Sequence, residues 1–344
     1  MRSLPVGLLT LLAALGVAAC DGGLPSPSTT YEGSPLFTSA ARLVRPQRLD
    51  RRPSWFAPEI KQRATYLFVS DAGTGDVYLY ALPAMKIAAR VTGFSQPQGE
   101  CSDNRGDVWV TDTIAQTIYE LSHTGRLLNT LSDKAGYPDA CAWDPSTGNL
   151  AVMNIFDLAS VAGSVLVYPG GTGSPATYAN PSQYFYNFGG YDNRGDLFFD
   201  GRNADGTFML SELSSKAGSA ETIKVAGTSI YYPGMIQWVG SYLDVGDQSC
   251  GNGDATCVYR LAISSKTATV KGVTNLENYN GGAVCDMAQG VVVKGRTIAG
   301  SDNDFCGYAP SATYSWPYPG GGLPKAYDIG PDSLPVGAAV SAGQ

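Results

Sequence analysis

The stretch from Pro97 to Leu131 constrains the fold more than any other part of the sequence. It contains four short runs rich in β-branched or aromatic residues, at Gly99–Asp103, Asp107–Thr111, Thr117–Leu121 and Leu127–Leu131. Gly, Asn or Asp residues bound these runs, including the tight turn Asn104-Arg105-Gly106. Runs of this kind between turn residues are typical of strands in an antiparallel meander. The stretch therefore predicts one four-stranded antiparallel sheet.

The same pattern recurs along the chain at intervals of roughly 40 to 50 residues, the repeat length of propeller blades. Its clearest mark is a second strand that ends in an acidic or amide residue, at Asp71, Asp112, Asn154, Asp200, Asp247 and Asp302. A turn also recurs before that strand, as Asp103-Asn104-Arg105-Gly106 and Asp192-Asn193-Arg194-Gly195. The sequence therefore predicts an all-β fold, a six-bladed β-propeller of four-stranded antiparallel blades.

The two ends of the repeated region complement each other. The first repeat begins at Tyr66 with what should be its second strand, so its innermost strand is missing there. The segment Pro335–Ser341 resembles Pro97–Ser102, which opens another repeat. We predict that this C-terminal strand closes the first blade, because such pairing removes two free sheet edges.

The repeat resembles a known family. The pattern Asp-x-x-Gly-(Asp/Asn)-hydrophobic-x-Val-(Thr/Ser)-Asp, followed by a polar loop and a hydrophobic strand, is similar to the NHL repeat and to the related gluconolactonase and senescence-marker-like propellers. The resemblance covers about residues 64–341. It implies the fold, but one fold hosts many activities, so it does not set the function.

The N-terminus has the features of an export signal. One Arg is followed by an apolar run from Val6 to Ala19, which is too short to span a bilayer. Val17-Ala18-Ala19-Cys20 resembles the bacterial lipobox, in which cleavage precedes the cysteine and the thiol carries lipid. The alternative is an ordinary signal peptide, with Cys20 used elsewhere. The sequence thus predicts an exported lipoprotein, attached through Cys20 to the membrane of the bacterial cell envelope.

Three regions are expected: a signal peptide over residues 1–19, a lipid-anchored linker with a basic segment over 20–62, and the propeller over 63–344. The basic segment would contact anionic lipid headgroups or pack on the acidic propeller, with Trp55 and Phe56 as anchors. Residues 64–344 hold 15 basic and 26 acidic side chains. This acidic balance argues against a nucleic-acid partner.

Lipidation of Cys20 would leave six cysteines, an even number that suits disulfides in an oxidising compartment. Two of them occupy near-equivalent positions in neighbouring inner strands, two bracket a short loop, and two remain. Among the 15 connectivities that six cysteines allow, the predicted topology favours Cys101–Cys141, Cys250–Cys257 and Cys285–Cys306. All three bridges are expected to brace the same face.

We expect a ligand site on that face. In an antiparallel meander the start of the first strand and the end of the second lie at the same sheet edge. This reasoning selects Glu100, Asp139, Tyr186, Tyr232 and Asp286 as ligand-binding residues, suited to a protein, peptide or glycan. Two alternatives stay open: the aspartates that end second strands could cap backbone turns, and the tyrosines could pack between blades.

The sequence favours a binding or interaction module over an enzyme. The enzymatic alternative is a metal-dependent lactonase or hydrolase of gluconolactonase-like type in the central channel. It would hold Ca²⁺ or Mg²⁺ through Glu100, Asp139, Asn187, Gln237 and Asp286, whereas the binding module needs no cofactor. The single histidine, His123, is expected in an exposed turn without a catalytic role. No Gly-x-Ser-x-Gly or Walker-type motif occurs.

Overall fold

Short antiparallel strands make up nearly all regular structure in the computed structural model. It describes residues 53–58, 60–159, 162–304, 306–307, 309–330 and 334–343, which lie within one unit spanning residues 50–344. The predicted signal peptide, the lipidation site Cys20 and the linker up to residue 52 lie outside the described residues. No helix among the described residues is long and apolar enough to cross a membrane.

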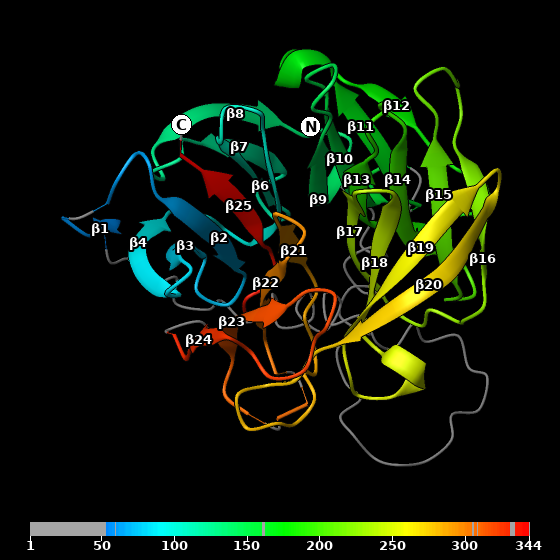
Figure 1. Ribbon diagram of the computed structural model, residues 1–344. Coiled ribbons are helices and arrows are strands. Elements are labelled where there is room, and N and C mark those ends of the chain that lie inside the picture. Colours follow the sequence, from blue (N-terminus) through cyan, green and yellow to red (C-terminus); the bar gives the residue numbers. More distant parts are fainter. Residues whose placement is uncertain are drawn as a thin grey trace, which may run out of the picture. The chain divides into compact units, whose positions relative to one another are not determined.

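The strands form five sheets in a propeller-like arrangement (Figure 1). The first sheet contains β1 (Trp55–Phe56), β4 (Lys86–Thr92), β3 (Asp76–Leu82), β2 (Thr65–Asp71) and β25 (Ala339–Ala342). The second contains β5 (Pro97–Ser102), β6 (Val108–Asp112), β7 (Thr117–Leu121) and β8 (Leu127–Ser132). The third contains β9 (Gly136–Trp143), β10 (Leu150–Asp157), β11 (Ser164–Tyr168) and β12 (Ala176–Tyr178).

The fourth sheet has eight strands and consists of two meanders. One is β13 (Phe185–Tyr191), β14 (Leu197–Arg202), β15 (Phe208–Leu213) and β16 (Glu221–Ala226); the other is β17 (Pro233–Val239), β18 (Tyr242–Asp247), β19 (Cys257–Ser264) and β20 (Thr267–Asn275). The fifth contains β21 (Gly290–Val293), β22 (Thr297–Asp302), β23 (Ala312–Pro317) and β24 (Ala326–Asp328). Two short 3₁₀ turns, η1 (Pro169–Gly171) and η2 (Cys250–Asn252), lie in connections.

The eight-stranded sheet corrects the prediction of six separate blades. Its two meanders are joined by the parallel pairing of their outermost strands, with Lys224 opposite Thr267 and Ala226 opposite Thr269. Figure 1 shows β16 and β20 side by side at the edge of the molecule. The structure therefore has four separate sheets and one double sheet. The sequence gave no sign of this junction, because edge pairing satisfies backbone groups without requiring particular side chains.

The predicted closure by the C-terminus is confirmed. β25 pairs antiparallel with β2, with Thr65 opposite Ala342 and Phe68 opposite Ala339 (Figure 1). Pro335 also forms an isolated bridge with Asp71. The innermost strand of the first sheet thus comes from the end of the chain, so no free edge of β2 faces the centre.

The sheet begins earlier in the chain than the predicted boundary at residue 63. β1 pairs with β4, with Trp55 opposite Arg90 and Phe56 opposite Ala89. The linker's last residues therefore supply a fifth, outermost strand of the first sheet. Both aromatic side chains stay largely exposed on this edge.

The core lies between neighbouring sheets. Tyr66, Phe68 and Leu79 of the first sheet pack with Val108 and Val110 of the second, and all five are almost fully buried. The second strands are buried over most of their length, and β6 over all of it, because sheets cover both of their faces. This explains why they read as continuous apolar runs rather than as an alternating pattern.

Candidate binding site

A cavity of about 440 Å³ opens where the inner strands end. We call this side of the ring the cavity rim, and the side where the inner strands begin the start rim. The C-terminal ends of all six inner strands contribute to the cavity, through Ser102, Trp143, Tyr191, Trp238, Val293 and Ala342. The predicted ligand site was on the start rim, so the concave site lies on the opposite side of the ring.

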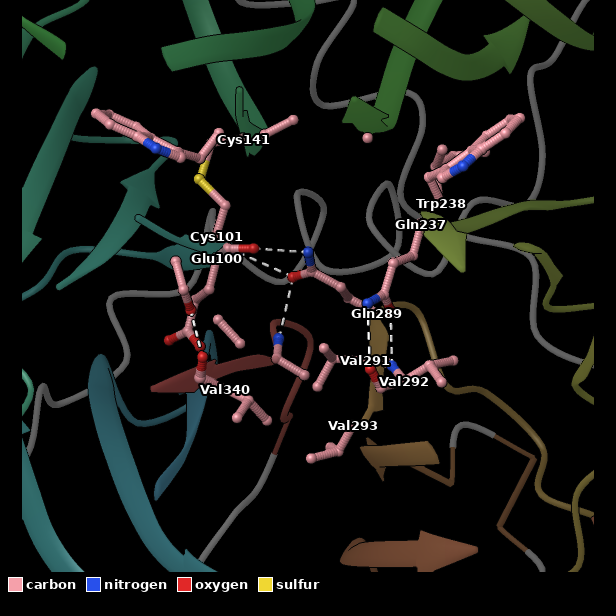
Figure 2. Close-up of a pocket in the computed structure, with 18 of the residues that line it drawn as sticks. Glu100, Cys101, Cys141, Gln237, Trp238, Gln289, Val291, Val292, Val293 and Val340 are labelled. Atoms are coloured by element: carbon pink, nitrogen blue, oxygen red, sulfur yellow. Dashed lines mark hydrogen bonds between the residues drawn. A yellow bond between two sulfur atoms is a disulfide. The ribbon is translucent and has the colours of Figure 1, made fainter. Parts of the chain in front are cut away.

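Two glutamine side chains in the cavity, Gln289 and Gln237, bond to backbone groups of the inner strands (Figure 2). The Gln289 amide donates to the Glu100 carbonyl oxygen over 2.8 Å, and its oxygen accepts the N–H groups of Glu100 at 2.9 Å and Ala338 at 3.0 Å. Gln237 pairs in the same way with both backbone groups of Val292. Each amide therefore replaces a missing strand at the free inner edge of a sheet, and each retains one N–H for a ligand.

Aromatic rings lie at the C-terminal ends of three consecutive inner strands, β9, β13 and β17. Trp143 stacks on Trp109 of the preceding sheet with ring centroids 6.4 Å apart, and Trp238 stacks on Phe198 at 5.9 Å. Both of these cavity tryptophans, and Tyr191 between them, are partly exposed. Because one face of each indole is fixed by its partner, the rings are rigid and need no ordering on binding.

The cavity carries little charge. Its ionisable groups include Glu100 and the exposed Lys294. Burial raises the pKa of the Glu100 carboxyl well above its usual value, and the nearby Ala339 backbone N–H offsets this only partly. Burial therefore favours the neutral form of Glu100, and the remaining polar lining consists of amides and hydroxyls such as Gln237, Gln289 and Ser102.

The predicted acidic residues are buried rather than gathered at a mouth. Glu100 is 1% exposed and is the fourth residue of β5, not its first. Asp139 occupies the middle of β9 and accepts a 3.0 Å hydrogen bond from Asn187. Burial raises the pKa of Asp139 to about 7, against the opposing effect of that amide. Of these two, only Glu100 lines the cavity.

The other three predicted residues lie away from the cavity. Tyr186 is fully buried, and its hydroxyl exchanges hydrogen bonds with the backbone of Asn180. The Arg202 guanidinium lies 4.5 Å from the centre of the Tyr232 ring. Asp286 precedes β21, and burial raises its pKa to about 7. The structure therefore brings none of the three into the concave site.

The aspartates that end second strands have a structural role. As the capping alternative expected, Asp71, Asp247 and Asp302 accept the backbone N–H two residues further on. They also bond to the segment before an inner strand. Asp112 accepts the N–H groups of Ser95 at 2.7 Å and Gln96 at 2.9 Å, just before β5 begins. Asp247 accepts those of Tyr231 and Tyr232 before β17. Asp71 and Asp302 likewise receive N–H groups from the segments that lead into their inner strands. These carboxylates stabilise the connections between sheets at the start rim.

The six cysteines pair as expected, in bridges Cys101–Cys141, Cys250–Cys257 and Cys285–Cys306. The expectation that all three brace one face is wrong. Cys101 is the fifth of six residues in β5, so its bridge to β9 borders the cavity rim (Figure 2). The other two bridges lie next to the ends of β18 and β22, at the start rim. The error arose because β5 begins at Pro97 rather than Gly99.

His123 is also placed differently from the prediction. It is 6% exposed, its Nδ1 lies 2.6 Å from Ser341 Oγ, and its ring packs on Tyr66 at 5.1 Å. The Ser341 hydroxyl in turn donates to the Gly106 carbonyl oxygen. The turn that carries His123 therefore packs against β25 and stabilises this closing strand. It is not exposed to solvent as predicted.

The geometry offers little support for a metal in the channel. Among the described residues, the three carboxylates close enough to share an ion are Asp103, Asp107 and Glu120. Arg105 already pairs with these side chains, at 2.9 Å, 3.5 Å and 2.8 Å respectively. Of the predicted metal ligands, Asn187 bonds to Asp139, and Gln237 bonds to the backbone of Val292.

The sequence analysis missed the two cavity tryptophans and Gln289. One signal was available: an aromatic residue stands directly before the turn aspartate in Trp143-Asp144 and Tyr191-Asp192, where the first strand of a repeat must end. Gln289 gave no comparable signal, because its role depends on the second sheet, which is almost 190 residues away in sequence.

Comparison with known proteins identifies the fold only. No protein-family model and no curated protein matches the sequence. A crystal structure of a nidogen/laminin complex includes a chain with a TM-score of 0.61 and 14% identity, covering 81% of this chain and 99% of that one. A protein of unknown function from Bacteroides caccae gives 0.60 and 13%, with the same coverage. Both similarities support a β-propeller.

Proposed function

We propose that the protein is an exported, lipid-anchored binding module that takes the end of a saccharide chain into the cavity. The lipobox-like Val17-Ala18-Ala19-Cys20 supports the anchor. The observation that carries the binding role is the cavity itself, which combines partly exposed, pre-stacked indoles with amide and hydroxyl groups and few ionisable side chains. A pocket of this size and lining is typical of a small-ligand site.

The neutral lining selects the ligand class. A charged ligand would lose its hydration in the cavity, and Lys294 is the exposed charge that could pair with it. A saccharide is uncharged, presents C–H faces to aromatic rings, and offers hydroxyls to the remaining N–H groups of Gln237 and Gln289. An extended peptide would instead require free backbone edges, and the two glutamines already occupy those of β5 and β21.

We also infer that the eight-stranded sheet represents two fused blade units of an NHL-type propeller. The recurring turn supports this interpretation. Asp103 accepts the N–H groups of Arg105 and Asp107, and Asp192 accepts those of the matching Arg194 and Asp196. The second of these turns precedes β14, inside the double sheet. The repeat therefore continues through the sheet in which separate blades are lost.

The test is a glycan array followed by calorimetry on the best binder. We expect Trp238→Ala to weaken the affinity at least tenfold, because a stacking platform is removed. Trp55→Ala, at an exposed tryptophan outside the cavity, should leave the affinity unchanged.

Three results would contradict this function. Binding to a parallel peptide array alone would exclude the saccharide. Equal losses in both tryptophan variants would place the site outside the cavity. Chelator-sensitive opening of a lactone would favour the hydrolase.

A further inference from the structure

Four exposed apolar side chains occupy adjoining outer edges of the first and second sheets. Trp55 and Phe56 on β1 are 49% and 39% exposed, and Leu127 and Leu128 on β8 are 60% and 53% exposed. β1 and β8 are the outermost strands of these sheets. A Cβ atom added at Gly125 would lie 3.4 Å from the Phe56 ring, two residues before Leu127. We call these four residues the rim patch.

Four basic side chains lie near the rim patch along the chain or on the adjoining strand. Arg126 directly precedes Leu127, Lys86 begins the strand that pairs with β1, and Lys61 and Arg63 follow β1 in the chain. All four are exposed, and none of them forms an ion pair with another described residue. This is the reverse of the acidic balance over residues 64–344. Exposed apolar side chains with exposed cations nearby suit an anionic lipid surface.

The course of the chain favours a membrane over a protein partner. The described chain begins at Pro53, two residues before the rim patch, and 32 residues separate it from the proposed lipidation site at Cys20. An anchor at Cys20 would thus hold the first sheet close to the bilayer at a high effective concentration.

We propose that the rim patch docks the propeller on an anionic lipid bilayer. Trp55, Phe56, Leu127 and Leu128 would enter the headgroup region, while Lys61, Arg63, Lys86 and Arg126 contact lipid phosphates. The choice of a bilayer as the occupant rests on the anchor in the proposed function, but it does not depend on the saccharide. The rim patch is on outermost strands and the cavity is between innermost ones, so docking leaves the cavity open.

The test is vesicle co-sedimentation of the chain from Cys20 to Gln344 carrying Cys20→Ser, so that no acyl chain contributes. We expect at least tenfold tighter binding to vesicles of phosphatidylcholine with phosphatidylglycerol than to phosphatidylcholine alone, and a loss of this preference at high salt. Leu127→Glu combined with Leu128→Glu should reduce binding at least tenfold. Lys86→Glu combined with Arg126→Glu should do the same and is a second route if the leucine variant is unstable.

The matched control is Leu323→Glu combined with Ile329→Glu. These residues are 57% and 47% exposed and lie next to β24, the outermost strand of the fifth sheet. Their replacement adds the same charge at similar exposure and should leave vesicle binding unchanged. No preference for anionic vesicles, or an equal loss in the control, would overturn the proposal. Mass spectrometry of the exported protein tests acylation of Cys20 separately.

Discussion

The two rims of the ring use their polar side chains differently. At the start rim, Asp112 and Asp247 are fully buried, and their carboxylates accept backbone N–H groups from the segment that leads into the inner strand. At the cavity rim, Asp103 and Asp192 accept N–H groups only within their own turns, the neutral amides of Gln237 and Gln289 bond to the inner-strand backbone, and partly exposed aromatic rings remain available. A row of carboxylates in a propeller thus does not by itself mark a ligand site, because these carboxylates are buried and bonded to the backbone.

The comparison also assigns different roles to the disulfides. Cys101–Cys141 links two inner strands beside the cavity, whereas Cys250–Cys257 and Cys285–Cys306 hold connections at the start rim. The cavity rim is therefore fixed by one covalent bridge, two glutamine amides and the carboxylates of its turns. The start rim depends on carboxylates and on two bridges.

The largest expected effect comes from removing residues 335–344, which serve both rims. β25 completes the first sheet, its Ala342 lines the cavity, and Pro335 bridges Asp71 at the start rim. Deletion should cost more than about 4 kcal/mol of unfolding free energy, because buried apolar residues and a full strand pairing are lost. Urea unfolding measures this, with removal of Gln344 alone as the control. An unchanged midpoint would show that the ring does not need its closing strand.

Next in size is the replacement of a single start-rim carboxylate. Asp112→Ala leaves the buried N–H groups of Ser95 and Gln96 without an acceptor, and should cost about 3 kcal/mol. Asp112→Asn retains one oxygen and should cost less. At the cavity rim, exposed Asn104 donates one hydrogen bond to Pro145. Asn104→Ala should therefore change the unfolding free energy by less than about 0.5 kcal/mol. Equal losses at the two positions would remove the distinction between the rims.

The smallest expected effect is a pH dependence. Burial raises the pKa values of Asp139 and Asp286 to about 7, so the folded protein holds protons that the unfolded chain, with ordinary values near 4, has released. Stability should therefore fall as pH rises from about 4 to 7, because each carboxyl must release its proton in the folded protein. Asp139→Asn, which keeps an oxygen for Asn187, should flatten the thermal unfolding profile. An unaltered slope would exclude Asp139 as a source of the dependence.

His123 should act in the opposite direction. Burial lowers its pKa below the ordinary value of 6.5, so its contribution to stability is complete above that value and is lost as pH falls below it.

The repeat pattern predicted the all-β fold, the bounds of β7, the closure by the C-terminal strand and the disulfide pairs, because all of these follow from local strand and turn signals. The site was less predictable. Placing Glu100 at the start of its strand needed the position of β5 to within two residues, and a shift of that size moved Cys101–Cys141 to the other rim. Pairings between distant segments, such as Gln289 with β5 or β16 with β20, leave no local signal.

The closing strand has a consequence for biogenesis. The strand that completes the first sheet, Ala339–Ala342, is synthesised after all the other described strands. A growing chain therefore carries an unfinished ring until β25 has been made. Termination of translation before β25 would then release an open ring with an exposed β2 edge for quality-control proteases.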